Sequence, residues 1–114
     1  MKTTEEFQHE IAPFTWVELR ESVSVCLNAG EYLQEVFDAC GLEGSGYEWE
    51  GLARVFLEEK LPELMEVIEF DSEADMFCVY SKDTETLRQM IRRFKTVCED
   101  RACILDLLSR AEPD

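Results

Sequence analysis

The chain switches twice between the two-residue repeat of β-strands and the longer repeat of helices, and this alternation limits the folds it can adopt. The first strand pair shows it well, because Val23, Val25 and Leu27 alternate with Ser24 and Cys26. Short polar turns separate the members of each pair, which is typical of hairpins. The sequence therefore predicts two hairpins, with strands at 16–19 and 23–27 and at 67–70 and 76–80.

Helical patterns follow each hairpin. After the first hairpin we expect helices over 31–40 and 49–61, each with apolar residues on one face. After the second, residues 87–98 carry apolar side chains at i, i+3, i+4, i+7, i+10 and i+11, the clearest amphipathic pattern in the chain. Ser81 or Asp83 can cap this helix. A last helix is expected after Asp100, and a short helical segment before Pro13, where Phe7 and Ile11 are four residues apart.

The order hairpin, two helices, hairpin, two helices favours one compact arrangement. A strand face that is apolar must be covered, and the helices supply apolar faces of the right size. A chain of 114 residues matches the usual length of one domain. We predict a single α+β domain over residues 1–114, a four-stranded antiparallel sheet with helices packed on one face.

The acidic excess limits the classes of partner. Twenty-six acidic residues against eleven basic ones give a formal net charge of −15. Such a charge repels phosphate backbones and anionic lipid surfaces, so direct nucleic-acid or membrane binding is not expected. It attracts basic proteins and accelerates their capture. The same charge also serves solubility alone, and composition does not separate these two interpretations.

The five cysteines and the N-terminal residues point to a reducing compartment. The number of cysteines is odd and no CxxC pair occurs, so we expect small buried thiols rather than disulfides or zinc ligands. Residues 1–6 do not lead into an apolar signal-peptide core, and no apolar run is long enough to span a bilayer. We therefore expect a cytoplasmic protein.

Catalytic and metal-binding patterns are absent from the sequence. His9 is the only histidine and has no nucleophile beside it, so an exposed helical histidine is expected. Residues 71–75 resemble the start of a calcium loop, but Met76 occupies the position where that loop needs glycine. We expect no catalytic residue, no cofactor and no metal.

The segment 44–50 is the first candidate for partner binding. Its two glycines predict unusual backbone angles. Aromatic and acidic residues follow them, at the start of an expected helix. One interpretation is a turn whose tryptophan anchors the helix in the core. The other is an exposed junction where aromatic side chains and acids contact a basic partner. The candidate residues are Gly44, Gly46, Tyr47, Glu48, Trp49 and Glu50.

The turn of the second hairpin is the second candidate. Asp71, Glu73 and Asp75 are expected at a rigid and exposed tip, where a solvated turn is the simplest interpretation. The same acids are suited to contact a basic protein. They form one binding surface with segment 44–50 if both lie on the same side of the molecule.

Three stretches resemble immunity protein family 51 of the bacterial polymorphic toxin systems. They are residues 43–53 (EGSGYEWEGLA), 56–64 (FLEEKLPEL) and 70–77 (FDSEADMF). The resemblance runs from about Pro13 to the tail. Ser45 is one difference, since the family is expected to have Asn in that loop, and Asn tolerates left-handed backbone angles better.

The resemblance implies a function that the composition does not supply. It implies a non-catalytic cytoplasmic antidote with an α+β fold, which binds a cognate secreted toxin domain. Toxins of these systems include many nucleases, which are often basic, and a charge of −15 suits such a partner. Among the candidates, Gly44, Gly46, Tyr47 and Trp49 match the signature of the family.

Two other functions remain open at this point. The outer face of the 87–98 helix carries Arg88, Arg92, Arg93 and Lys95, which could meet an acidic face of a second copy. The protein would then be a self-associating adaptor or structural protein. A small enzyme is the third option, with no supporting residues.

Overall fold

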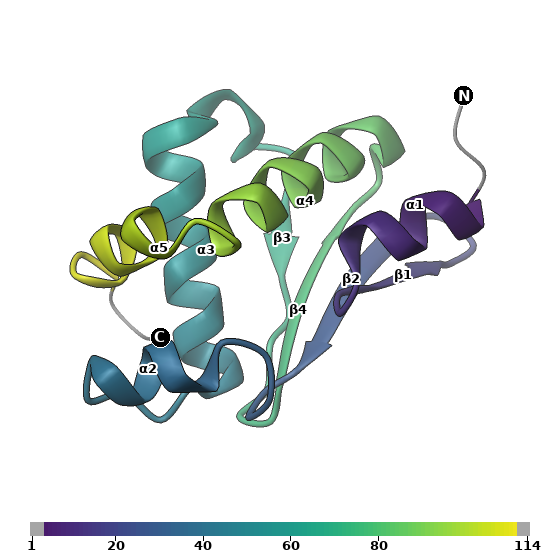
Figure 1. Ribbon diagram of the computed structural model, residues 1–114. Helices are drawn as coiled ribbons and strands as arrows, with labels where there is room; N and C mark the ends of the chain where they lie inside the picture. The colour runs from purple at the N-terminus through teal and green to yellow at the C-terminus, as the bar shows by residue number, and fades with distance from the viewer. Residues whose placement is uncertain (1–3, 112–114) are drawn as a thin grey trace.

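Four antiparallel strands form one sheet in the computed structural model, which describes residues 4–111 (Figure 1). The strand order is β1-β2-β4-β3, so the two hairpins are joined through their second strands. Val25 of β2 lies opposite Val79 of β4, and Cys26 lies opposite Cys78. The strands are β1 (Thr15–Glu18), β2 (Val23–Asn28), β3 (Glu69–Phe70) and β4 (Met76–Ser81).

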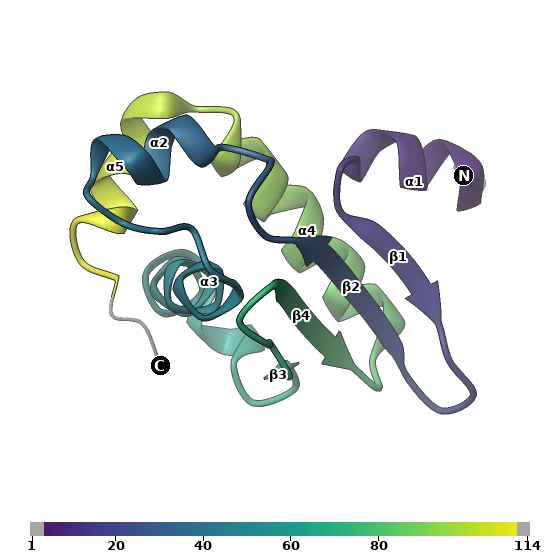
Figure 2. The ribbon, with the colours of Figure 1, turned by 90° about the horizontal axis from the view of Figure 1, so that it is seen from below.

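The helices lie against one face of this sheet, as Figure 1 and Figure 2 together show. Contacts with the strands come mainly from α1, α3 and α4, whereas α5 packs on α3 and α4. The α+β class and the four-stranded antiparallel sheet predicted from the sequence are thus confirmed. The helices are α1 (Thr4–Ile11), α2 (Gln34–Ala39), α3 (Gly46–Lys60), α4 (Thr84–Cys98) and α5 (Arg101–Leu108), with a 3-10 turn at Pro62–Leu64.

Two helix boundaries differ from the sequence prediction. The helix α2 begins only at Gln34, because Leu33 before it has a left-handed backbone with φ of 57°. The helix α3 begins at Gly46, three residues earlier than expected, because Ser45 caps it. Asp83, one of the two residues suggested by the sequence, caps α4 through its side chain, and Asp100 caps α5 in the same way.

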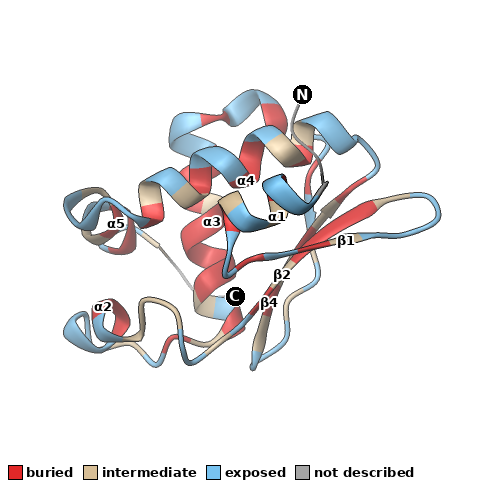
Figure 3. Ribbon diagram, turned by 45° about the vertical axis from the view of Figure 1, so that its right-hand side comes forward, coloured by how far each residue is buried: buried red, intermediate tan, exposed pale blue. Residues whose placement is uncertain are grey.

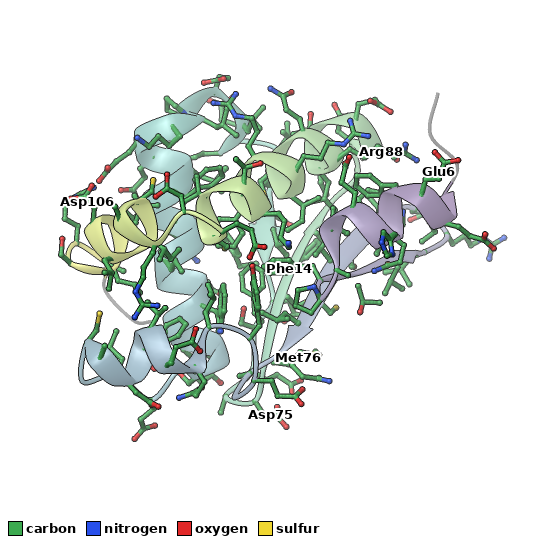
Figure 4. The ribbon with its side chains drawn as sticks, viewed as in Figure 1. Glu6, Phe14, Asp75, Met76, Arg88 and Asp106 are labelled. Atoms are coloured by element: carbon green, nitrogen blue, oxygen red, sulfur yellow. The ribbon has the colours of Figure 1, made fainter. Side chains whose placement is uncertain are left out.

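The core between sheet and helices is built around aromatic rings. Phe14, which directly precedes β1, lies at its centre (Figure 4) and packs edge-on against Trp49, with ring centroids 5.9 Å apart. Phe77 from β4 and Phe94 from α4 complete the group around these two rings. Buried residues run along α3, β2 and β4 (Figure 3). One aromatic cluster therefore joins the sheet, α3 and α4.

The basic face of α4 is engaged within the molecule. Arg88 lies over the rings of Phe7 and Trp16, 5.2 and 5.5 Å from their centroids. Arg92 pairs with Glu10 of α1 at 2.7 Å. These contacts hold α1 against α4, and burial of Phe7 reinforces them.

The outer edge of β1 is closed by a side chain. The Gln8 amide donates to the Phe14 carbonyl at 2.7 Å, and its oxygen accepts from the Trp16 amide at 2.8 Å. An open strand edge invites pairing with another chain. Gln8 therefore blocks strand addition at this side of the sheet.

Two expectations about exposure have different outcomes. His9 is exposed on α1, as expected. The expectation of buried thiols is correct only for Cys98, because Cys40 is exposed at the end of α2 and Cys26, Cys78 and Cys103 are half-buried. Within residues 4–111, no helix is both long and apolar enough to cross a membrane.

Candidate functional site

The start of α3 and the tip of the β3–β4 hairpin lie in direct contact. The Gly46 amide donates to the Ala74 carbonyl at 2.9 Å. A Cβ atom on Gly46 would lie 1.9 Å from the Glu73 carbonyl oxygen, closer than any real contact. Only glycine permits this approach, so the two candidate segments form one continuous surface.

Gly44 has a different requirement. Its φ of 81° lies in the left-handed region, where L side chains are strained. A Cβ atom there would also lie 2.7 Å from the side-chain oxygen of Gln34. Both glycines are buried, and they shape the loop rather than present atoms to a partner.

Ser45 and Glu48 form a capping box at the start of α3. The Ser45 hydroxyl accepts from the Glu48 amide at 3.2 Å, and the Glu48 carboxylate accepts from the amides of Ser45 and Gly44. These bonds satisfy amide groups that a helix start leaves unpaired. Glu48 is half-buried and committed to this cap, so its contribution to partner binding stays a prediction.

Two further candidates are also buried, contrary to the interface interpretation of the segment. Trp49 is 1% exposed and belongs to the aromatic core, which was the alternative interpretation of this residue. Glu50 is 6% exposed, and its carboxylate pairs with Arg54 at 3.0 Å. The expectation that Glu50 lies at an exposed junction is wrong, because α3 starts earlier and turns this residue inward.

The exposed candidates are Tyr47 and the acids of the hairpin tip. Tyr47 is 40% exposed on the first turn of α3. Asp71, Glu73 and Asp75 are all exposed, and Figure 4 shows Asp75 at the lower end of the molecule. Because Gly46 docks against residues 73–76, these four side chains occupy the same end of the molecule. We call them the tip surface.

The tip itself is rigidly held. The Asp71 amide donates to the Cys78 carbonyl at 3.0 Å, and the Cys78 amide donates to the Ser72 hydroxyl at 3.1 Å. Glu73 and Met76 exchange backbone hydrogen bonds across the turn. The acids therefore project from a fixed backbone, which lowers the entropy lost when they bind.

The tip acids influence the neighbouring strand. Burial raises the pKa of the Cys78 thiol to about 12, with further contributions from Cys26, Asp71 and Glu73. The Tyr80 pKa is also raised, first by its hydrogen bond to Glu69 and to a smaller degree by Asp71. The tip acids therefore make a minor contribution to both shifts.

The tip acids do not form a metal site in the part of the chain that the structure describes. No group of three or more metal-ligating side chains comes together within residues 4–111. The acids of the hairpin project from a two-sided turn, whereas a calcium loop wraps its ligands around one point. The arrangement suits contact with cationic side chains.

Comparison with known proteins assigns a family. A family model described as Immunity protein 51 matches residues 14–113. The chain belongs to the immunity protein 51 family. The resemblance carried by residues 43–53, 56–64 and 70–77 is thereby confirmed. No curated protein and no solved structure matches this immunity-family chain.

Two structural features of this immunity-family chain were missed from its sequence. The Ser45-x-x-Glu48 pattern is a capping box and would have placed the start of α3 correctly. The hydrogen bonds of Gln8 at the edge of β1 cannot be predicted from the sequence, because they depend on α1 folding back beside β1.

Proposed function

We propose that this chain is an antidote that binds a cognate toxin domain in the cytoplasm and neutralises it without catalysis. The observation that carries the proposal is the family match over residues 14–113. The acidic excess supports a basic partner, because a net charge of −15 steers cationic surfaces toward the protein. A nuclease fits this chemistry, since a cleft that binds phosphodiesters is itself basic.

The tip surface is the proposed first contact. Tyr47 supplies an aromatic side chain, a type enriched among residues that dominate binding energy. Asp71, Glu73 and Asp75 supply exposed carboxylates at the same end of the molecule, and these can pair with Lys and Arg groups of the toxin. A partner held in this way would have its substrate cleft blocked by an acidic surface.

Self-association is the alternative, and one observation weighs against the form considered above. Arg88 and Arg92 stack on aromatic rings, and Arg92 and Lys95 pair with carboxylates of the same chain. The basic face of α4 is thus largely occupied. Light scattering at micromolar concentration tests the alternative, and a stable dimer would support it.

Co-expression tests the leading proposal. The tagged protein is expressed with the toxin domain encoded beside it, and co-elution and cell survival are measured. We expect a complex that rescues growth. A basic nuclease from an unrelated system serves as the control, because simple charge attraction would capture both proteins equally.

A tip variant then tests the contact surface. Tyr47→Ala with Asp75→Lys should weaken binding by about tenfold or more while the protein stays folded, since both side chains are exposed. Unchanged affinity would remove the tip surface from the proposal and leave the antidote function standing.

A further inference from the structure

The face of the sheet opposite the helices is bare among the described residues. Along β4, the side chains that point to the helices are buried and those between them are half-buried. The helices gather on one side only, and Figure 2 shows the other face uncovered. This open face consists of Thr15, Val17, Ser24, Cys26, Asn28, Met76, Cys78 and Tyr80.

The open face is uncharged at its centre. Its residues are small or neutral, and none of the four strands carries Lys, Arg or His. Its largest side chains are Met76 and Tyr80, which are half-buried between neighbours. A surface of this kind is suited to close contact, because little charge must be desolvated there.

Each cross-strand row of the open face ends on an acid at the β3 side. One row runs from Val17 through Ser24 and Tyr80 to Glu69. The next row passes through Cys26 and Cys78 and ends at Asp71, whose amide bonds to the Cys78 carbonyl. The third row passes through Met76 to Glu73. We call Glu69, Asp71 and Glu73 the acidic rim.

The acidic rim brings three carboxylates to one edge of the sheet. Several bases pair with acids on the helical side, among them Arg54 with Glu50 and Arg110 with Glu59. The exposed bases Arg20 and Lys82 lie in loops at the opposite end of the sheet from the tip. Burial is the main cause of the raised Cys78 pKa, and Asp71 and Glu73 add smaller contributions to it, while the hydrogen bond to Glu69 is the main cause of the raised Tyr80 pKa.

We propose, on the basis of the antidote function, that a basic toxin domain docks face-on against the open face and places Lys or Arg side chains along the acidic rim. Docking by strand addition at β1 is blocked, because Gln8 occupies that edge. A second copy of this chain is disfavoured, because two acidic rims would face each other. A nucleic acid or an anionic membrane is repelled for the same reason.

The open face is too small to be the whole contact, so we expect the contact to include the tip surface. The four strands contain four, six, two and six residues, and at about 3.3 Å per residue and about 4.8 Å between strands they present roughly 300 Å². A stable complex buries about 800 Å² on each partner. The open face therefore supplies less than the area that a stable complex needs. We expect the tip surface to supply the rest, because Glu73 belongs to both the tip surface and the acidic rim.

Charge reversal at the acidic rim tests the inference. The change is Glu69→Lys with Asp71→Lys, and the matched control is Glu58→Lys with Glu63→Lys. All four residues are exposed, both pairs change the net charge equally, and Glu58 lies near the end of α3 remote from the tip. Binding of the toxin domain encoded beside the protein is measured by calorimetry at moderate salt. We expect the rim variant to lose about tenfold or more in affinity and the control to lose less than about threefold.

A second pair of variants tests the β1 side of the open face. Thr15→Arg adds bulk to an exposed position far from the rim, and Thr96→Arg makes the same change on the outer surface of α4. Face-on docking predicts weaker binding for Thr15→Arg alone. Circular dichroism and melting temperature show that each variant is folded.

The outcomes separate this inference from the antidote proposal. If the unchanged protein does not bind the neighbouring toxin domain, the antidote function fails and the docking surface fails with it. If it binds, and both open-face variants bind as tightly as their controls, the toxin docks elsewhere and only this inference is overturned. Selective loss in both open-face variants supports it.

Discussion

Gly46 is the residue on which the contact between α3 and the hairpin tip depends. Its φ is not positive, so its role is not a special backbone angle but the room it leaves for the Glu73 carbonyl. Gly41 offers a comparison, since it has a φ of 73° and open space around its Cβ position. Gly46 therefore tests the need for space, and Gly41 tests the need for a left-handed backbone.

We expect Gly46→Ala to lower the free energy of unfolding by about 3 kcal/mol, because the backbone of the tip must move to admit the methyl group. Gly41→Ala should lower it by only about 1 kcal/mol, the cost of a left-handed backbone for an L residue. Urea unfolding of both variants provides the measurement. Equal losses would show that the close approach at Gly46 does not determine stability.

Tyr32 ties the segment before α2 to the end of α4. Its hydroxyl donates to the Glu99 carboxylate, and its ring stacks on Trp49 with centroids 6.0 Å apart. Burial and this bond raise the Tyr32 pKa, while the same bond, followed by Lys95, lowers the Glu99 pKa. The contribution of this hydrogen bond to stability should therefore depend on pH in both the acidic and the alkaline range.

The Tyr32→Phe variant isolates this link. We expect the free energy of unfolding of the unchanged protein to exceed that of the variant by about 1 kcal/mol near neutral pH. This is a low value for a hydrogen bond, because the carboxylate is exposed. The difference should shrink as pH falls through the lowered pKa of Glu99, because the folded carboxylate then becomes protonated. It should also shrink above pH about 10, where the unfolded tyrosine ionises and the folded one resists ionisation. A difference independent of pH would contradict the bond.

At the scale of elements, the pairing of β2 with β4 determines how the two hairpins join. The Ala29 amide donates to the Asp75 carbonyl, which marks these residues as a hydrogen-bonded pair. Alternation along the strands then places Cys26 and Cys78 at a pair without direct hydrogen bonds, where Cα atoms are about 4.5 Å apart. Their sulfur atoms are 3.4 Å apart.

This register predicts which thiols an oxidant will join. Diamide at pH about 9 should form a Cys26–Cys78 disulfide, because the Cα separation lies within the range that disulfides span. Each thiol gives up one proton and one electron to diamide, which is reduced to the hydrazine. Alkaline conditions help because the Cys78 pKa is raised to about 12 and little thiolate exists near neutrality. Peptide mapping without reductant identifies the bond.

Two controls accompany the oxidation. Cys98→Ser should leave the product unchanged, because Cys98 is buried in α4, away from the open face. Cys78→Ser should abolish it. A disulfide between Cys26 and any other cysteine would mean that the register of β2 and β4 is wrong.

Repeat patterns in the sequence predicted the elements well, and tertiary contacts account for the rest. The alternation in residues 23–27 and the apolar face of residues 87–98 identified β2 and α4, because both report burial along one element. The inward turn of Glu50 and the closure of the β1 edge by Gln8 depend on neighbours distant in sequence. Local patterns contain no information about such neighbours.

The candidate site divides along the same line. The sequence correctly singled out the hairpin acids as exposed and Trp49 as a core anchor in one of its two interpretations. The contact between the tip and the start of α3 required the fold, because it joins residues 46 and 74 through the pairing of four strands. The open face likewise emerges only once the helices are seen to cover one side.

At the scale of the whole molecule, the acidic excess acts on stability and on binding in opposite directions. A net charge of −15 repels itself within the folded protein, and this destabilises the compact state. The exposed ion pairs, such as Arg92 with Glu10, offset little of it, since each contributes about 0–1 kcal/mol. The same field accelerates the approach of a cationic partner.

Salt should therefore stabilise the free protein and slow the formation of its complex. Raising ionic strength from about 0.01 M to about 0.1 M shortens the screening length from about 30 Å to about 10 Å, which weakens self-repulsion and long-range steering together. We expect the melting temperature to rise by a few degrees while the association rate with the toxin domain falls by about tenfold or more. Scanning calorimetry and stopped-flow mixing measure the two effects in the same buffers. A melting temperature that falls with salt would mean that the ion pairs outweigh the net charge, and a rate that does not change would mean that the acidic field does not guide the partner.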